Sequence, residues 1–311
     1  MSASRSGAAQ PRAGVLGLGN MGLGIATTLA AAGWYVQGHD PDPRARAAAR
    51  DHGVPVGEVA GPAGEVFVLS LPSAAVVREV TPQLLKDGRA RVVIDTTTSD
   101  PRTSADMARL CARAGAHFVD APVSGGRTGA WSGRLTAFVG GDPAAVEAAA
   151  PVLDAFTASW SHLGPAGSGN VVKLLNNLLC AANMVAVAEA VDVLAAYGLD
   201  IRQSLAALNT GSGRSAVSEG VFAGSILKGE TRGGFAVGLM TRDVELGVAT
   251  ARERGAAPAV MTAVAGAWRQ ALDRLGPSAD CNVAPSVFTT ATDCLDPENL
   301  TSQAQRKEDD R

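Results

Sequence analysis

The feature that most constrains the fold of this 311-residue chain is an apolar strand that runs directly into a glycine loop and a helix. The loop follows Val15 and Leu16 and has the pattern G-x-G-x-x-G, as Gly17, Leu18, Gly19, Asn20, Met21 and Gly22. Its first glycine permits a tight turn, its second lets the backbone approach a pyrophosphate, and its third lets the helix pack on the strand. The helix N-terminus offers N–H groups and partial positive charge to phosphates. We therefore expect Gly17, Gly19, Asn20, Met21 and Gly22 to bind a dinucleotide.

An acidic residue follows the next strand-like run at a useful spacing. The run 34–40 ends at Asp40, about 20 residues past the loop, where a carboxylate binds a ribose hydroxyl in dinucleotide-binding folds. Because that carboxylate would repel a 2′-phosphate, it favours NAD over NADP. Arg44 and Arg46 follow closely and keep NADP as an alternative. The other interpretation of Asp40 is a turn residue before Pro41.

Short β-rich runs alternate with helical segments up to about residue 163. The runs after the second strand are 65–71, 91–95, 117–120 and 135–139. This alternation predicts an α/β fold, a doubly wound parallel Rossmann sheet with helices on both faces. Ligands bind beyond the carboxyl ends of such strands. We therefore look for chemistry in the loops that hold Leu71 and Pro72, Thr97, and the run Ser124, Gly125 and Gly126.

A long helical pattern follows the last strand signal. Residues 171–199 are rich in Leu, Val and Ala and contain no proline, which predicts one long buried helix. Lys173 and Asn177 are four residues apart and emerge on the same face, which suggests a site. In the other interpretation, Lys173 snorkels to the surface and the asparagines cap or bridge helices. We predict a tail at 1–12, a Rossmann domain at 13–166, an all-helical substrate and dimerisation domain at 167–295, and a flexible tail at 296–311.

Composition is that of a soluble, cytoplasmic protein. Lys+Arg number 27 and Asp+Glu 30, which points to neither a nucleic acid nor an anionic membrane as partner. We expect no membrane span, which needs roughly 18 consecutive apolar residues, and the N-terminus lacks the apolar core of a secretion signal. Cys111, Cys180, Cys281 and Cys294 have no C-x-x-C spacing, so we expect neither a zinc site nor a disulfide framework. No metal is expected.

Four segments, in order along the chain, resemble the β-hydroxyacid dehydrogenase family, which includes 3-hydroxyisobutyrate dehydrogenase. They are Gly17–Gly22, Asp120–Gly126 with Gly129, Ala130 and Gly133 beyond it, Gly169–Asn177, and Phe235–Asp243. The second and third segments are specific as a pair. The resemblance implies a Rossmann domain, a long connecting helix and a helical C-terminal domain. It also implies a homodimer or homotetramer in which the helical domains pack together.

The resemblance also implies roles for individual residues. Lys173 matches the family's general acid and base, and burial of a lysine disfavours its charged form, as a general base requires. Asn177 matches the amide that binds the substrate or orients the lysine. Loop residues match the substrate site and the cofactor site, respectively Ser124, Gly125 and Gly126, and Leu71, Pro72 and Thr97. The implied reaction transfers a hydride between NAD(H) and a small 3-hydroxy acid or its semialdehyde.

Two departures from the family leave the substrate open. Arg242 stands where the family usually has a lysine near the cofactor, and a guanidinium differs from an ammonium in geometry. The segment 281–288 lacks the usual aspartate-rich pattern. Arg127 and Trp131 fall where family members vary and are candidates to read the far end of the substrate, although a surface arginine is an equal interpretation of Arg127.

Three rival functions share this architecture. Imine reductases typically have aspartate or tyrosine where Lys173 stands, and 6-phosphogluconate dehydrogenase usually has a longer helical domain. A non-catalytic dinucleotide-binding relative would have lost the lysine. Lys173 together with Asn177 therefore favours an enzyme that acts on a hydroxy acid.

Overall fold

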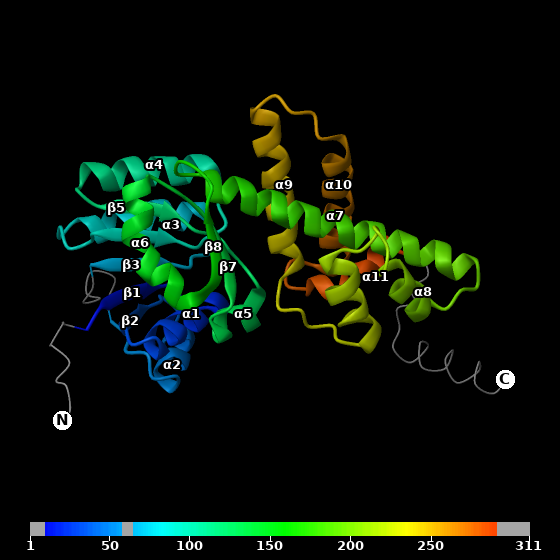
Figure 1. Cartoon of the computed structure of the whole chain (residues 1–311), viewed down its shortest axis with the longest axis horizontal. Coiled ribbons are helices and arrows are strands. Elements are labelled where there is room, and N and C mark those ends of the chain that lie inside the picture. The colour runs from blue at the N-terminus through cyan, green and yellow to red at the C-terminus, as the bar shows by residue number, and fades with distance from the viewer. Residues whose placement is uncertain (1–9, 58–64, 291–311) are drawn as a thin grey trace. The chain divides into compact units, whose positions relative to one another are not determined.

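The computed structural model describes residues 10–57 and 65–290. Contacts divide the chain into two compact units, Met1–Lys173 and Leu174–Arg311. The division falls inside one helix of 29 residues, α7 (Ser168–Ala196), which appears green in Figure 1. The expected outer tails at 1–9 and 296–311, and Cys294, lie outside the described residues.

The first unit is built on an eight-stranded sheet in the order β2-β1-β3-β4-β5-β7-β6, with β8 beside β7. Its strands are β1 (Arg12–Leu16), β2 (Tyr35–His39), β3 (Val66–Leu69), β4 (Val92–Asp95), β5 (His117–Asp120), β6 (Val123–Ser124), β7 (Leu135–Gly141) and β8 (Thr157–His162). The strands from β1 to β5 pair in parallel, as the alternating pattern predicted. β1 begins at Arg12, within the segment expected to be a tail.

The edge of the sheet beyond β5 departs from the expected all-parallel arrangement. β7 runs antiparallel to β5 and β6, and β8 pairs with β7 in parallel. We did not predict β8, because its sequence TASWSH has no apolar run and most of its side chains are exposed or half-buried. An edge strand with one solvated face carries a weak hydrophobic signal.

Three helices of this unit begin with the same dipeptide, aspartate followed by proline. Asp42, Asp100 and Asp142 are N-caps, and each side chain accepts a backbone N–H of the following turn. Proline at the first helical position has no N–H to leave unpaired. The helices of the unit are α1 (Asn20–Ala31), α2 (Pro43–Asp51), α3 (Ala74–Leu85), α4 (Pro101–Arg113), α5 (Gly126–Ser132) and α6 (Pro143–Phe156).

Alternate residues of the parallel strands point into two different hydrophobic cores. Val15, Ile94 and Val119 pack in one core with α1 and α6, while their neighbours Val93 and Phe118 pack in a second core. The second core holds side chains of α3 and α4, which include Val77, Leu84, Met107 and Cys111. Since successive strand residues face opposite ways, the sheet is covered on both faces (Figure 1). This confirms the Rossmann architecture.

The regular elements in the described part of the second unit are helices. Besides most of α7, it contains α8 (Ile201–Leu208), η1 (Val217–Ala223), η2 (Ile226–Lys228), α9 (Val237–Glu253), α10 (Ala259–Leu275), η3 (Cys281–Val283) and α11 (Pro285–Phe288). Its core is centred on Trp268, whose indole N–H donates to the Ala181 carbonyl of α7 at 3.2 Å. Leu178, Met184 and Val191 of α7 belong to the same core.

By length and hydropathy, α7 is the helix in the described ranges that would suffice to cross a membrane. The same helix supplies side chains to the core around Trp268, and the core helix of a soluble protein has the same composition. Its hydropathy is therefore weak support for a membrane span.

Candidate active site

The glycine loop is shaped by close contacts at two of its three glycines. Gly17 has φ +89°, and a Cβ on it would stand 2.1 Å from the Ser70 carbonyl oxygen. A Cβ on Gly22 would stand 1.8 Å from the Gly17 carbonyl oxygen. Both positions therefore require glycine, for the turn and for the helix contact that the sequence predicted.

Gly19, between them, has a different environment. It is the N-cap of α1, and no described side chain caps the helix by a hydrogen bond. No described atom lies within 4 Å of where its Cβ would stand. The first turn of α1 thus presents backbone N–H groups beside open space, and an anion such as a pyrophosphate fits there.

Asp40 lies just past β2, and both of its carboxylate oxygens bind backbone. Oδ2 accepts the Leu18 N–H of the glycine loop at 2.7 Å, and Oδ1 accepts the Asp42 N–H at 2.8 Å. Arg46 donates to the carbonyl oxygens of Asp40 and Pro41 at 2.8 and 2.7 Å. The carboxylate is therefore fixed beside the glycine loop, and its contact with a ribose hydroxyl stays a prediction.

The loops after β3 and β4 are joined to each other and to the glycine loop. The Thr97 hydroxyl accepts the Leu71 N–H at 3.0 Å, and the Leu71 side chain lies 3.4 Å from the Cβ position of Gly17. Thr97 is buried, Leu71 is half-buried and Pro72 is exposed. The structure thus brings together Gly17, Leu71 and Thr97, which the sequence assigned to the cofactor from three separate segments.

The predicted substrate loop is open and glycine-rich. Ser124 ends β6, and the exposed Gly125 and Gly126 follow with φ +123° and +61°. Side chains rarely adopt such angles, so glycine is required here. The exposed turn lacks side chains at both glycines, so its backbone could close on a carboxylate.

Lys173 and Asn177 lie one turn apart on α7, and both are buried, with 7% and 6% exposure. The Asn177 amide Nδ2 donates to Asp243 Oδ2 of α9 at 2.8 Å, and Asp243 is itself buried. Arg242 donates to the other oxygen of Asp243 from Nε at 3.1 Å and from Nη2 at 2.8 Å. Asp243 therefore fixes the orientation of the Asn177 amide. It also binds the guanidinium of Arg242, which the sequence assigned to the cofactor.

Sequence reasoning missed a cluster of buried polar residues around the start of α7. Asp95 and Asp120 end neighbouring strands at paired positions, and both are fully buried. Burial raises the pKa of Asp95 to about 7 and that of Asp120 to about 6, because a buried carboxylate loses the hydration of its charge. Asp120 and Asn170 stand inside segments that carried the resemblance, but no local pattern indicates their contacts.

Trp131 packs inside the first unit. Its ring meets His52 edge to face at a centroid distance of 4.7 Å, and it lies against the core that contains α1. The Arg127 guanidinium is 5.8 Å from the Trp131 ring centroid, and Arg127 is exposed. The tryptophan has a packing role that accounts for its place in the sequence.

Comparisons with known proteins match both parts of the chain. Residues 12–164 match the NAD-binding domain of 6-phosphogluconate dehydrogenase, and residues 167–286 match the NAD-binding domain of NADP-dependent 3-hydroxyisobutyrate dehydrogenase. The 2-(hydroxymethyl)glutarate dehydrogenase of Eubacterium barkeri is 34% identical over 81% of this chain and 86% of its own. The mitochondrial 3-hydroxyisobutyrate dehydrogenase of Homo sapiens is 33% identical over 78% of this chain and 76% of its own.

Solved structures agree with these relatives. The 3-hydroxyisobutyrate dehydrogenase of Mycobacterium tuberculosis, solved with L-serine, has a TM-score of 0.80 at 28% identity and covers 90% of this chain and 98% of its own. Psf3, solved with NADP⁺, has a TM-score of 0.78 at 27% identity and covers 89% and 100%. An imine reductase from Myxococcus stipitatus reaches 0.60 at 14% identity, with 90% and 100% coverage, and shares the fold alone. The chain belongs to the β-hydroxyacid dehydrogenase family, whose members use NAD or NADP.

Proposed function

We propose that this protein oxidises a small 3-hydroxy acid to its semialdehyde, or catalyses the reverse reduction, with a preference for NAD. The observation that carries the proposal is the buried pair Lys173 and Asn177 on one face of α7. The relatives' names denote acids such as 3-hydroxyisobutyrate and 2-(hydroxymethyl)glutarate. Each of these acids carries a hydroxymethyl group on the carbon next to a carboxylate, which supports a substrate of that class.

The residues that would hold the cofactor are those of the glycine loop, Asp40, Leu71, Pro72 and Thr97. The open first turn of α1 suits the pyrophosphate, and Asp40 suits a ribose hydroxyl. Two observations support NAD over NADP: the Asp40 carboxylate, and the use of Arg46 on backbone carbonyl oxygens. When bound, the nicotinamide accepts or supplies the hydride.

Lys173 would move the proton. In the oxidation, its neutral amine takes the proton of the substrate hydroxyl as the O–H bond breaks, and in the reduction its ammonium returns a proton to the carbonyl oxygen. Burial supports this role because it disfavours the charged form. The chain has four lysines, at 86, 173, 228 and 307, against 23 arginines. Arginine keeps its proton at every working pH, so a buried lysine in such a chain points to proton transfer.

Two groups would hold the substrate. Asn177, oriented by Asp243, would bind the hydroxyl or carbonyl oxygen through its amide. Ser124 with the N–H groups of Gly125 and Gly126 would bind the carboxylate, since small residues let backbone close on an anion. Arg242 stays a proposed neighbour of the cofactor, which it would reach through rotation away from Asp243.

The test is a substrate panel read by NADH and NADPH absorbance. We expect turnover with 3-hydroxyisobutyrate or a related 3-hydroxy acid in one direction and its semialdehyde in the other, faster with NAD than with NADP. Cyclic imines are included because imine reductases share the fold. Turnover of imines alone would move the protein to that class, and binding of NADH without turnover of any member would favour a non-catalytic relative.

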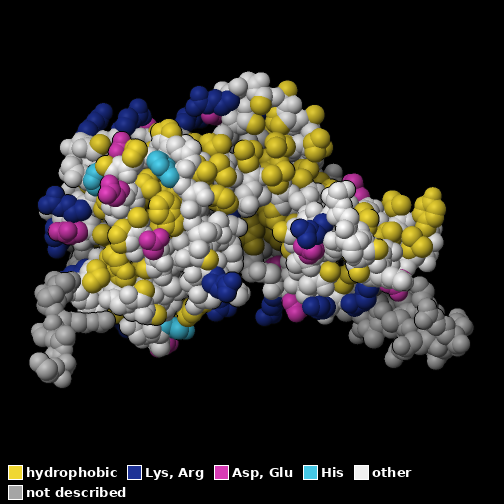
Figure 2. Space-filling model, in the orientation of Figure 1, with side chains coloured by type: hydrophobic (Ala, Val, Ile, Leu, Met, Phe, Trp, Pro, Cys, Tyr) yellow, Lys and Arg dark blue, Asp and Glu magenta, His cyan; other side chains and the backbone are white. Residues whose placement is uncertain are grey.

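We also propose a cytoplasmic homodimer or homotetramer that forms through the helical unit. In Figure 2, hydrophobic side chains are exposed over α9 and near the end of α7. The large exposed hydrophobic residues of the helical unit include Leu179, Val193, Tyr197, Leu199 and Leu208. Exposed hydrophobic side chains that gather on one face are typical of an interface, which supports this proposal. Sedimentation of the purified protein measures the state, and a monomer at micromolar concentration would contradict it.

A further inference from the structure

Three polar residues form one stripe along the start of α7. Asn170, Lys173 and Asn177 stand at positions i, i+3 and i+7, which place side chains on one face of a helix. All three are buried, with 0%, 7% and 6% exposure. Asn177 is fixed by Asp243, as described above. Asn170, at the other end of the stripe, has no part in the proposed chemistry, so its burial needs a separate reason.

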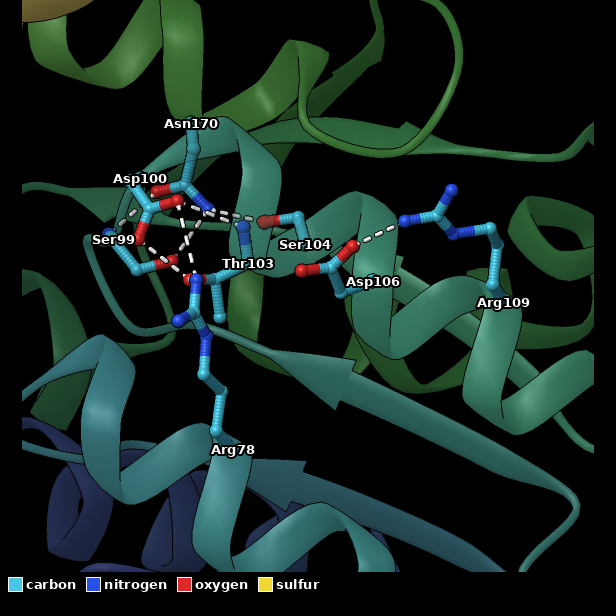
Figure 3. Close-up of polar contacts among 8 residues, drawn as sticks. All are labelled: Arg78, Ser99, Asp100, Thr103, Ser104, Asp106, Arg109 and Asn170. Atoms are coloured by element: carbon cyan, nitrogen blue, oxygen red, sulfur yellow. Dashed lines mark hydrogen bonds and ion pairs between the residues drawn. The ribbon is translucent and has the colours of Figure 1, made fainter.

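Asn170 binds the junction of β4 and α4. Its Oδ1 accepts the Ser99 N–H at 2.8 Å, and its Nδ2 donates to the hydroxyls of Ser104 at 3.0 Å and Ser99 at 3.3 Å. Figure 3 shows the amide directed at both serines. Below them, Asp100 and Arg78 both contact Thr103, so the start of α4 is itself braced. The amide of Asn170 thus has three partners on a fixed element.

A second contact holds the same turn of α7 from β5. Asp120 Oδ1 accepts the Gly167 N–H at 2.7 Å, and its Oδ2 accepts the Asn170 N–H at 2.9 Å. A Cβ on Gly169 would stand 2.2 Å from the Phe138 carbonyl oxygen, and one on Gly140 would stand 2.6 Å from Asp120 Oδ1. The helix start therefore meets β7 backbone to backbone, without room for side chains. These backbone contacts and hydrogen bonds set the position of the first turn of α7.

The segment that binds Asn170 is the loop after β4, which also holds Thr97, a residue that we expect at the cofactor. Ser99 lies two residues after Thr97, whose hydroxyl binds the Leu71 N–H and whose N–H donates to Asp95. One short segment therefore contacts the expected cofactor residues at one end and α7 at the other. Lys173 stands three residues beyond Asn170, about 4.5 Å along the helix axis at about 1.5 Å per residue. A shift of the first turn would pass to Lys173 almost unchanged.

We propose that Asn170 is a positioning residue: its three hydrogen bonds fix the first turn of α7 to the loop after β4, and so hold the Lys173 amine in register with the bound cofactor. What Lys173 does there rests on the proposed function, whereas the tie between Asn170 and the loop does not. A misplacement of about 1 Å in a reacting group costs about a hundredfold in rate. Asn170 touches neither the substrate nor the cofactor in this scheme, and it acts only through the helix.

The test compares three variants. Asn170→Ala removes all three hydrogen bonds, and Ser104→Ala removes one of them. The control is Asn209→Ala, which deletes an amide that binds the Ser218 hydroxyl in the second unit. With 3-hydroxyisobutyrate and NAD, we expect Asn170→Ala to lower kcat by about tenfold or more, with a larger isotope effect for substrate deuterated at the carbinol carbon. NADH affinity, read by fluorescence, stays within about twofold, and Asn209→Ala keeps wild-type kcat.

A second readout does not need turnover. Protein grown with ε-¹³C lysine has four lysine signals, at most, to follow by NMR as pH is varied, and Lys173→Arg identifies one of them. The proposal requires the Lys173 titration midpoint to move in Asn170→Ala, by less in Ser104→Ala, and not in Asn209→Ala. Ser104→Ala carries the test if Asn170→Ala does not fold. Absence of 3-hydroxyisobutyrate turnover in the wild type would overturn the proposed substrate alone. An unmoved Lys173 midpoint, or an equal movement in Asn209→Ala, would overturn the positioning role.

Discussion

Two helices of the first unit begin in opposite ways, and the difference separates binding from positioning. The start of α1 has no side-chain cap within the described part of the chain, and Gly19 leaves open space beside it. The start of α7 receives the Asp120 carboxylate, which accepts the N–H groups of Gly167 and Asn170. Both ends carry the same partial positive charge. One is available to an anion from solution, and the other is neutralised by an anion of the protein.

The comparison teaches what each arrangement costs. An open helix end is stabilised only when its ligand arrives. An internal carboxylate fixes the helix permanently, but it must be buried together with its charge. The raised pKa values of Asp120 and Asp95 record that cost, since both carboxyls hold their protons more tightly than in water. Four variants test the contrast, in order of expected effect.

Asp95→Asn tests the cost of the buried charges. Because the Asp95 pKa is raised from 3.8 to about 7, the folded protein binds a proton there that the unfolded chain releases. Stability of the wild type therefore falls as pH rises from about 4 to about 7, by on the order of a few kcal/mol at 1.36 kcal/mol per pKa unit. Asn keeps an acceptor for the Thr97 N–H without charge. We expect a higher melting temperature than wild type above pH 7 and no gain at pH 4.

The control for that experiment is Asp51→Asn, at an exposed position at the end of α2. It should give the same melting temperature as wild type at both pH values. A gain for Asp95→Asn that is equal at pH 4 and pH 8 would mean that packing, and not the charge, explains it.

Lys173→Ala tests whether the fixed helix carries the chemistry. Loss of a general acid and base lowers kcat by about a hundredfold or more, while the open end of α1 still binds cofactor. Steady-state kinetics and NADH fluorescence measure the two effects separately. Near-normal turnover would refute the proton-transfer role, and a parallel loss of NADH affinity would mean that the two ends are not independent.

Gly19→Asp gives the start of α1 a carboxylate, as Asp120 does for the start of α7. Gly19 has φ −68° and room for a Cβ, so the backbone accepts the change. The new carboxylate would cap α1 and repel a pyrophosphate, and we expect NADH affinity to fall by about tenfold, on the scale of charges at helix ends. Gly19→Asn is the neutral control and should lose less. Titration calorimetry measures NADH affinity in both variants. Equal losses of affinity in Gly19→Asp and Gly19→Asn would mean that the added side chain, and not its charge, weakens binding.

Asp40→Ala has the smallest expected effect. The variant loses a ribose contact and a charge that disfavours a 2′-phosphate, so NAD affinity should fall several-fold more than NADP affinity. It also releases the Leu18 N–H of the glycine loop, which weakens both cofactors somewhat. Ratios of kcat/KM with the two cofactors provide the measurement. An NADP preference in the wild type would contradict the proposal directly.

The same contrast explains how much the sequence could reveal. A close approach of two backbone segments needs glycine, so the G-x-G-x-x-G loop with Gly17 and Gly22 could be recognised in a single sequence. The strands β1 to β5 could be predicted from their apolar runs. Lys173 could be singled out from the sequence because a charged ammonium group is unusual in an apolar helix. The Asp120 and Asn170 ties join residues 47 to 71 positions apart, and no local pattern encodes such pairs. β8 was missed for the opposite reason, since a solvated edge strand has little apolar signal.

The rotamer of Arg242 is a feature that a sequence motif leaves open. The resemblance implies a place near the cofactor for Arg242, which stays a prediction, and in the structure its guanidinium donates to Asp243, which also accepts the Asn177 amide. A motif gives the position of a residue but not its rotamer, which depends on the neighbours that a longer side chain can reach.

The backbone contact between β7 and α7 also bears on how this chain tolerates change. Gly140 and Gly169 have no space for even one methyl group, and Gly167 adds a positive φ beside the Pro101 carbonyl. Any library that varies these three positions would consist largely of misfolded members. Arg127 is exposed and directly follows the proposed carboxylate site at Ser124, Gly125 and Gly126, away from the contact between β7 and α7. Substrate range in this protein should therefore be easiest to diversify at Arg127, while Gly140, Gly167 and Gly169 stay glycine in every active variant.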